Sequence, residues 1–232
     1  MSLSQDEIWL RAAAPFAAYR WLQAGVYRAT SPVMTPSAAW GLILNLAAID
    51  TRGDVVAGST QVRADVPKLQ IAIGELRRPT KATLYQQLHS YPVGNSGKDL
   101  AERTHGAKFW IAPAKRELLH QCDWILGVRG DRETITRVRR GIAGELQSER
   151  YGIPFAGDNQ HFFDRLEEVP LPLSAHWFAP VLEGATSKRS ARLTVGIDRR
   201  ESHQTTNVLY APSESATDAP RDDVWTWVPS AP

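Results

Sequence analysis

The longest apolar segment of the chain follows a short polar turn, and the two together occupy residues 31–50. Thr35 can cap the first free N–H groups of a helix, and Pro36 has the fixed φ that suits the first helical position. A helix that is apolar on all sides is a buried one, and about a dozen residues are too few to span a bilayer. The pattern therefore predicts a core helix that runs to about Ala48.

Alternation of apolar and polar positions predicts strands on both sides of this helix. The predicted strands are residues 7–14, 69–76, 108–112, 122–130, 192–198 and 207–211. Pro15 is expected to end the first strand, residues 16–28 are less regular, and residues 50–54 have the composition of a turn. The strand at 69–76 is expected to be half-buried.

A second helix, a polar excursion and a loose tail complete the pattern. Residues 131–150 have the spacing of an amphipathic helix, although Gly141 and Gly144 weaken this prediction. Residues 85–108 are polar, with a glycine-rich tip at 94–97. The tail, residues 212–232, is loose by composition, but Trp225, Trp227 and Val228 indicate that its end docks on the protein.

The predicted order is strand, buried helix, strand, excursion, strand, helix, late strand. This is the βαββαβ order of a ferredoxin-like or RRM-type layer, an α+β fold with two helices on one face of a sheet. We expect the other face to be free for a partner. The first domain would be residues 1–150, with the C-terminal strands and extension, residues 151–232, packed on it. The aromatic strand motifs of a true RRM are absent.

Composition excludes several classes of protein. Apolar residues make up 43% and charged residues 22% of the 232 residues, as in ordinary globular proteins. Cys122 is the single cysteine, so an intrachain disulfide and a cysteine-based zinc site are excluded. With no signal-peptide core and no transmembrane-length segment, a cytoplasmic protein is expected.

Charge is unevenly distributed along the chain. Residues 55–116 carry ten basic and four acidic side chains, a net charge of +6, whereas residues 201–232 have a net charge of −4. Arginine outnumbers lysine 21 to 6. This bias suits forked contacts to phosphate, and GC-rich coding would produce the same bias without a function.

Enzyme motifs mostly fail on inspection. Residues 94–98 resemble a phosphate-binding loop but lack its first glycine and its final Ser or Thr. The six histidines show no metal-ligand spacing, and there is no G-x-S-x-G motif, so no cofactor and no metal are expected. A metal-free ribonuclease needs only a base, an acid and a cation. His89, His105, Lys98 and Lys108 flank the excursion and could supply them, although solvated loop residues are the commoner explanation.

Two arginines and two aromatic residues precede the core helix. Arg20, Trp21, Tyr27 and Arg28 could hold single-stranded nucleic acid, or the aromatic pair could be the edge of the core. The following turn places Thr30, Ser31 and Thr35 at a helix N-terminus, where anions are favoured. The turn is therefore a candidate seat for a phosphate.

Residues 25–49, GVYRATSPVMTPSAAWGLILNLAAI, resemble the N-terminal signature of the Cas-five family. This family belongs to the RAMP superfamily and supplies a subunit of type I CRISPR Cascade complexes. The matching positions are Pro36, Ser37, Gly41, Leu42, Leu44 and Leu46. The later order of strand, long hairpin (the family's thumb) and returning strand is also similar, and the resemblance extends over about residues 7–211.

The resemblance implies a non-catalytic subunit that binds and caps the 5′ handle of crRNA in antiviral defence. Its partners would be the crRNA, the Cascade backbone subunits and the large subunit, with target DNA reached through the complex and no membrane contact. Cations along phosphates and flat groups against bases suit this role. The candidate RNA-binding residues are Arg20, Arg28, Ser31, Arg77, Arg78, Lys81, Tyr85, Lys98 and Lys108.

Two other functions stay open at this stage. One branch of the family cleaves precursor crRNA with a tyrosine, a lysine and a histidine, a trio that no local motif of this chain matches. The second alternative is a protein-interaction subunit with little RNA contact.

Overall fold

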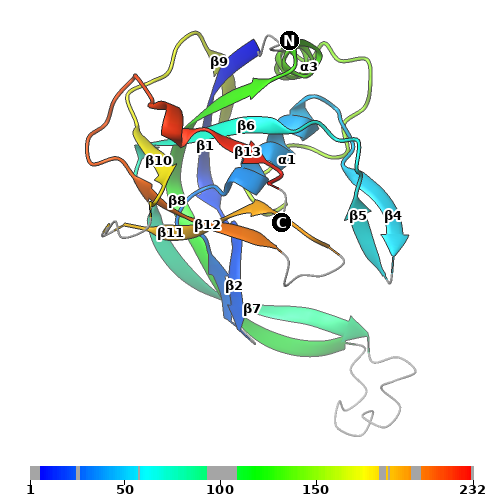
Figure 1. Cartoon of the computed structure of the whole chain (residues 1–232). Helices are drawn as coiled ribbons and strands as arrows, with labels where there is room; N and C mark the ends of the chain where they lie inside the picture. The colour runs from blue at the N-terminus through cyan, green and yellow to red at the C-terminus, as the bar shows by residue number, and fades with distance from the viewer. Residues whose placement is uncertain are drawn as a thin grey trace, which may run out of the picture.

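The computed structural model describes residues 6–24, 27–56, 58–92, 109–182, 187, 189–199 and 205–230. Its main feature is a strongly curled sheet of 11 described strands, which wraps around two α-helices (Figure 1). The chain is therefore an α+β protein in which strands predominate.

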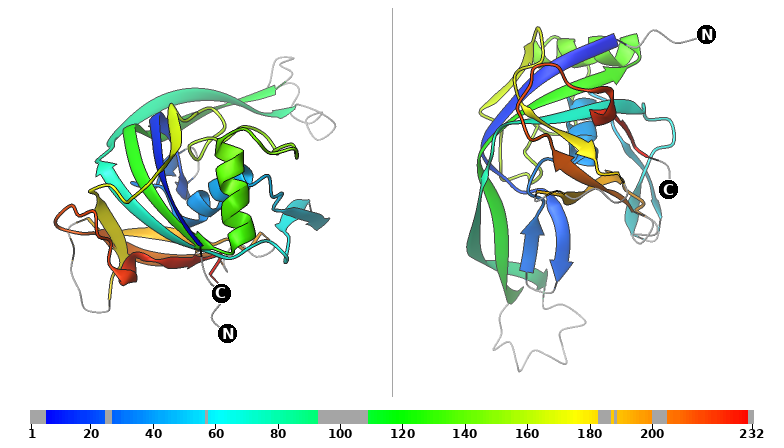
Figure 2. Two further views of the ribbon diagram at one scale, coloured as in Figure 1. Left: turned by 90° about the horizontal axis from the view of Figure 1, so that it is seen from above. Right: turned by 60° about the vertical axis from the view of Figure 1, so that its left-hand side comes forward.

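Four neighbouring strands at one end of this sheet have the order β6-β8-β1-β9. They are β1 (Asp6–Ala17), β6 (Leu69–Arg77), β8 (Phe109–Gly130) and β9 (Arg165–Val169). Each neighbouring pair is antiparallel. Helix α1 (Pro36–Leu46) lies between β1 and β6 in the chain, and α3 (Arg132–Ile142) lies between β8 and β9. Both helices occupy the concave side of the sheet (Figure 2).

Helix α1 forms where the local signals predict it. Thr35 Oγ1 accepts a hydrogen bond from Ala38 N at 3.2 Å, and Pro36 occupies the first turn. The last turn carries no basic residue of its own. Instead, Arg137 of α3 donates to the carbonyl oxygens of Ala47 (3.0 Å) and Ala48 (3.1 Å). The free carbonyls of α1 are thus capped from the other helix.

Helix α3 is shorter than predicted. Its N-terminus is capped by Asp131, whose carboxylate accepts from Thr134 N at 2.9 Å, and its apolar stripe buries Ile135 and Val138. It ends at Ile142 rather than near residue 150, because Gly144 has a φ of +75°. A glycine in this left-handed conformation is a common helix stop.

Strand β8 is a single strand of 22 residues, where the sequence suggested two shorter strands joined by a connection. Its first half pairs with β7 (Thr80–Pro92) in a long hairpin, and its second half pairs with β1 and β6 in the body. This hairpin projects from the body (Figures 1 and 2). The expected excursion therefore begins as a paired ladder at Thr80, and its tip, residues 93–108, lies outside the described residues.

The irregular segment before α1 also forms strands. Strands β2 (Arg20–Ala24) and β3 (Tyr27–Thr30) pair with each other, and β3 runs parallel to β8. Strand β1 continues to Ala17 past Pro15, which lies opposite Gln121; the latter has a φ of 60°. An irregularity in the partner strand accommodates a residue that cannot donate to the ladder.

Further strands arise where the sequence indicated turns or gave no strand. The segment expected to be a turn at 50–54 opens β4 (Arg52–Val56), which forms a separate two-stranded sheet with β5 (Ser59–Val62). The late strands are confirmed as β11 (Ala191–Gly196) and β12 (Thr206–Pro212). Strand β10 (His176–Pro180) joins β12 to β6.

The outer face of the sheet is not free, contrary to expectation. A second core cluster there contains Trp9 and Trp177, whose ring centroids are 5.5 Å apart, and Trp225 packs on Trp9 at the same distance. The tail forms the short 3-10 helix η3 (Asp222–Val224) and strand β13 (Thr226–Val228), which pairs with β6. The predicted docking of the tail is confirmed, and β6 is buried on both faces rather than half-buried.

Helices α1 and α3 are each 11 residues long. Within the described part of the chain, no helix has the length and apolar character needed to cross a membrane.

Candidate nucleic-acid interface

The body end of the β7–β8 hairpin, with β2 and β3 beside it, gathers three of the basic residues that the sequence singled out, Arg20, Arg28 and Lys81. Successive side chains of a strand point to opposite sides. The ladder pairs Tyr27 with Lys115 and Arg28 with Arg116, so these two pairs lie on opposite sides of the strands. The hairpin base therefore has an arginine side and a lysine–aromatic side.

The arginine side is hollowed into a cleft of about 480 Å³. Arg20 of β2, Arg28 of β3 and Arg116 of β8 line it, together with the loop residues Gly157 and Asp158. Arg116 forms an ion pair with Asp158, while Arg20 and Arg28 are exposed. Because guanidinium groups present fixed forks of donors, several of them around one cleft suit phosphate oxygens.

The lysine–aromatic side is organised around Glu117, which is only 7% exposed. Its carboxylate accepts hydrogen bonds from the Tyr27 hydroxyl (2.5 Å), Lys81 Nζ (3.1 Å) and Thr30 N (3.1 Å). One side chain thus joins β3, β7 and β8. Lys81 Nζ also lies 6.0 Å from the centre of a Trp21 ring, so this side combines cations with aromatic surfaces.

The environment of Glu117 keeps it ionised. Burial raises the pKa of its carboxyl, but the hydrogen bonds from Tyr27, Lys81 and the Thr30 N–H outweigh burial, and the pKa lies below its ordinary value. The same hydrogen bond to Glu117, with a smaller contribution from desolvation, raises the pKa of the Tyr27 hydroxyl. Tyr27 is accordingly held as a neutral donor and Lys81 as a paired cation.

Replacing Glu117 with glutamine is expected to lower the free energy of unfolding at neutral pH by about 2 kcal/mol, because hydrogen bonds to a charged, buried acceptor are lost. A carboxyl with a lowered folded-state pKa stabilises the fold above its unfolded-state pKa, and this contribution disappears as the pH falls through the folded-state pKa. The difference between wild type and E117Q should therefore shrink on acidification. Urea unfolding at several pH values measures it, and the exposed Glu214→Gln serves as control. A difference that grows on acidification would contradict this account.

The structure distributes the sequence-predicted residues unevenly. Arg20 and Arg28 meet in the cleft. Lys81 and Tyr85 lie on β7, and Tyr85 is 71% exposed. The remaining candidates divide between the exposed end of β6 and the residue after it (Arg77, Arg78), the protein interior (Ser31), and residues outside the described part of the chain (Lys98, Lys108).

The proposed phosphate seat at the start of α1 does not fit the observed turn. Ser31 is fully buried, and its hydroxyl donates to Val33 O at 2.8 Å. Val33, Met34 and Thr35 are also buried. The turn is part of the core, because its residues are buried and the Ser31 hydroxyl has its hydrogen-bond partner within the turn.

Lys115, Arg116 and Glu117 are the residues that sequence reasoning missed as site residues. They fall in the segment between the two strands that the sequence suggested, where a connection was expected. Lys115, Arg116 and Glu117 are three successive charged residues, so no apolar–polar alternation marked a strand there, and Pro113 also argued against one. Of the histidines in the ribonuclease hypothesis, neither His89 nor His105 has a described side chain.

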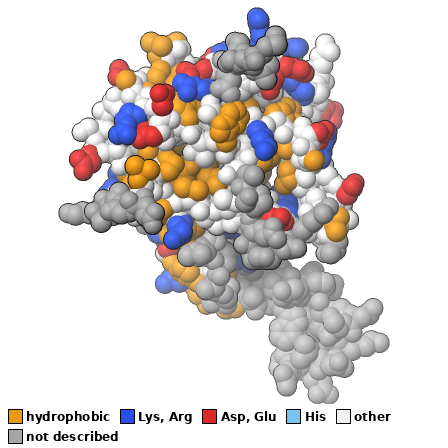
Figure 3. Space-filling model, viewed as in Figure 1, with side chains coloured by type: hydrophobic (Ala, Val, Ile, Leu, Met, Phe, Trp, Pro, Cys, Tyr) orange, Lys and Arg blue, Asp and Glu red, His pale blue; other side chains and the backbone are white. Residues whose placement is uncertain are grey.

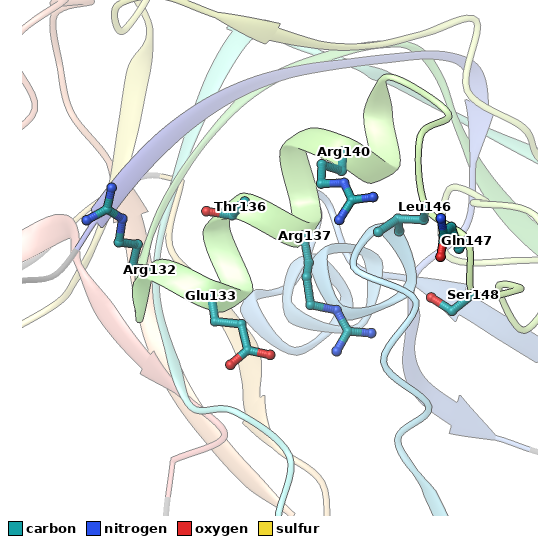
Figure 4. Close-up of a pocket in the computed structure, with 8 residues that line it drawn as sticks. All are labelled: Arg132, Glu133, Thr136, Arg137, Arg140, Leu146, Gln147 and Ser148. Atoms are coloured by element: carbon teal, nitrogen blue, oxygen red, sulfur yellow. The ribbon is translucent and has the colours of Figure 1, made fainter.

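A second hollow, of about 750 Å³, lies over the outer side of α3 (Figure 4). Arg137 and Arg140 reach from the helix into it, beside Gln147 and Ser148. Arg137 caps α1, and Arg140 donates to Glu145 O at 3.0 Å. These two arginines thus hold neighbouring backbone in place.

One face of the molecule carries no large patch of basic side chains among its described residues. On the face shown in Figure 3, basic side chains are interspersed with acidic ones and with hydrophobic groups. In the described ranges there is no group of three or more His, Cys, Asp or Glu side chains arranged to hold a metal ion. The hairpin base is therefore the candidate interface.

The curled sheet, the two helices and the projecting hairpin define the chain as a strand-rich α+β protein. A family model described as CRISPR-associated protein (Cas_Cas5) matches residues 7–143, more than half of the chain. The chain belongs to this family, which confirms the resemblance drawn from residues 25–49. A comparison with curated proteins gives no match.

One solved structure shares the fold at low sequence identity. A chain of a structure described as "CRISPR RNA-guided surveillance complex" is similar with a TM-score of 0.57 and 14% identity, over 94% of this chain and 96% of that chain. A second, described as "Crystal structure of Cas protein", has a TM-score of 0.45 and 14% identity, over 91% and 94% of the two chains. At 14% identity, the likeness to the first of these structures shows a shared fold, and the family is that of a CRISPR-associated protein.

Proposed function

We propose that this chain is the non-catalytic subunit of a type I CRISPR Cascade complex that binds and caps the 5′ handle of crRNA. The observation that carries the proposal is the hairpin base, where Arg20, Arg28 and Arg116 line one cleft. Single-stranded RNA is gripped by cations along its backbone and by flat side chains against its bases. Trp21 and Tyr27 supply such surfaces next to lysines on the opposite side.

A ferredoxin-like core of the RAMP type would present this interface. The antiparallel order β6-β8-β1-β9, with α1 and α3 in the two connections, supports that assignment. The hairpin would then be the thumb of the family. Projecting from the body, it would reach the neighbouring backbone subunit, while the body would contact the large subunit. Target DNA would be read by pairing with the guide, because this chain grips backbone and handle.

The proposal is tested in the assembled complex. Complex prepared with the wild-type chain should protect the 5′ handle of crRNA from nuclease, and complex prepared with Arg20→Ala/Arg28→Ala should leave it exposed while the remaining guide stays protected. Equal protection of the handle in both would refute handle capping. It would favour instead the protein-interaction subunit with little RNA contact.

Cleavage of precursor crRNA is the second candidate function, and one contact favours it. Lys115 Nζ lies 5.9 Å from the centre of the Tyr27 ring, which brings together two of the three residue types of the processing branch. His120 lies three residues after Glu117 on β8. Its side chain therefore points to the opposite side of the strand from Glu117 and Lys115. Incubating the purified chain with repeat RNA in EDTA decides between the two, since a specific cut at the handle boundary would establish the nuclease.

A further inference from the structure

Two phenylalanine rings are exposed side by side on the loop that follows α3. Phe155 is 45% exposed and Phe162 is 49% exposed, although large aromatic side chains are normally buried. The two residues form an isolated antiparallel β-bridge. Residues directly opposite in such a bridge have their side chains on the same side, about 5 Å apart at Cβ. The pair therefore presents two exposed aromatic side chains on one side of the loop, here called the Phe platform.

The Phe platform is held firmly from behind. Ala156, between the platform and the body, is fully buried, and its N–H donates to His161 O at 2.7 Å. Its carbonyl accepts from Ala18 N at 3.1 Å, which ties the loop to the end of β1. The ring of Phe16, also on β1, lies with its centroid 6.3 Å from that of His161. The platform thus has a fixed orientation outward.

The Phe platform borders the arginine cleft, because Gly157 and Asp158, two and three residues after Phe155, line that cleft. Gly157 has a φ of +81°, and a Cβ at this position would lie 2.5 Å from Ala18 O. Only glycine permits so close an approach. Asp158, the carboxylate that the loop contributes, is paired with Arg116. Arg20 and Arg28 thus remain the exposed cations of the cleft.

We propose that the Phe platform is a base-stacking site for single-stranded RNA whose phosphates occupy the arginine cleft. This inference rests on the proposed function, and it names a ligand contact outside the hairpin. Cations beside aromatic faces are the combination that holds unpaired nucleotides, and stacking tolerates any base because every base has a π-face. An apolar protein segment would gain nothing from the adjacent arginines, so continuity with the cleft favours RNA. The platform would fix the path of the RNA as it leaves the cleft.

The test uses two exchanges that separate stacking from hydrophobic docking. Phe155→Leu/Phe162→Leu keeps an apolar surface but removes the ring faces, whereas Phe155→Trp/Phe162→Trp keeps the ring faces. The ligand is single-stranded repeat RNA with 2-aminopurine at successive positions, and the control is Trp227→Leu, which removes a ring that is 47% exposed on β13. Circular dichroism establishes that each variant is folded, and the single variant Phe162→Leu replaces the leucine pair if that pair is not.

The leucine pair should weaken RNA binding by about tenfold or more, because loss of one stacked base costs about fivefold at the least. It should also restore the fluorescence of 2-aminopurine at one or two positions and leave the salt dependence of binding unchanged, because no phosphate contact is removed. The tryptophan pair and Trp227→Leu should bind like wild type. Wild-type affinity and quenching in the leucine pair would overturn the platform alone. Failure of the wild-type chain to bind RNA at all would overturn the proposed function as well.

Discussion

Replacing Gly141 with alanine is expected to lower the free energy of unfolding by about 3 kcal/mol or more, the largest effect of a single methyl group in the described fold. A Cβ at this position would lie 1.8 Å from the carbonyl oxygen of Leu46 and 2.8 Å from its carbon. Both atoms belong to the backbone of α1, so no side chain can rotate away. The two helices would have to separate, exposing the apolar residues packed between them.

The matched control is Gly41→Ala in α1. Nothing lies within 4 Å of a Cβ built there, and alanine in a helix interior is favoured over glycine by about 1 kcal/mol. Urea unfolding followed by circular dichroism should therefore give opposite signs for the two exchanges. For a chain of this size the loss in Gly141→Ala corresponds to a melting temperature lower by about 6–12 °C. Similar stability of the two variants would mean that α1 and α3 do not cross at Gly141.

The second large effect concerns RNA binding by the arginine cleft. Replacing Arg20 and Arg28 with alanine should reduce the affinity for single-stranded RNA by about 15-fold near physiological salt. Each lost phosphate contact removes about 0.7 from the slope of log K against log salt concentration, so the double variant should lose about 1.4. Fluorescence anisotropy of labelled repeat RNA over a range of salt concentrations measures both quantities.

The control for this experiment is Arg132→Ala/Arg140→Ala on α3. It changes the net charge equally, but α3 lies at the end of the body away from the hairpin (Figure 1). Its slope should remain close to the wild-type slope. An equal loss in both variants would show that only net charge matters, and the cleft would then have no special role in binding.

The sequence predicted those features of the fold that depend on neighbouring residues. The start of α1 follows from Thr35 and Pro36, whose roles need only the first turn of the helix. Strands β6, β11 and β12 form where the sequence pattern predicts them, and the matched family model spans α1. Local chemistry is sufficient in these cases because each element would have the same pattern in any fold.

Features that depend on contacts between residues far apart in the chain were not predicted from the sequence. Gly141 weakens the prediction of a helix, yet it is the residue that lets α3 approach α1. The outer face of the sheet was expected to be open, but Trp225 from the tail covers Trp9. Similarly, Arg116 and Glu117 belong to one site with β2 and β3 only because β3 pairs with β8 and β2 pairs with β3.

In the candidate site, the sequence predicted the arginines on the short strands β2 and β3 but not the cations on the long strand β8. Arg20 and Arg28 were named and share a cleft. Ser31 was named because it precedes a helix, although the turn around it is core. Whether a polar residue faces solvent is decided by the packing of the whole chain, which no local pattern contains.

Because β8 is one continuous strand, its register in the body decides which side of the hairpin base each of its residues faces. The strand is fixed in the body by its ladders with β1 and β6 and continues without interruption into the hairpin. A shift of one residue in a strand exchanges its two sides. One extra residue between the body and Arg116 would turn Arg116 away from the cleft and toward the side of Tyr27. The spacing along β8, as much as the identity of its side chains, therefore separates the cleft from the lysine–aromatic side.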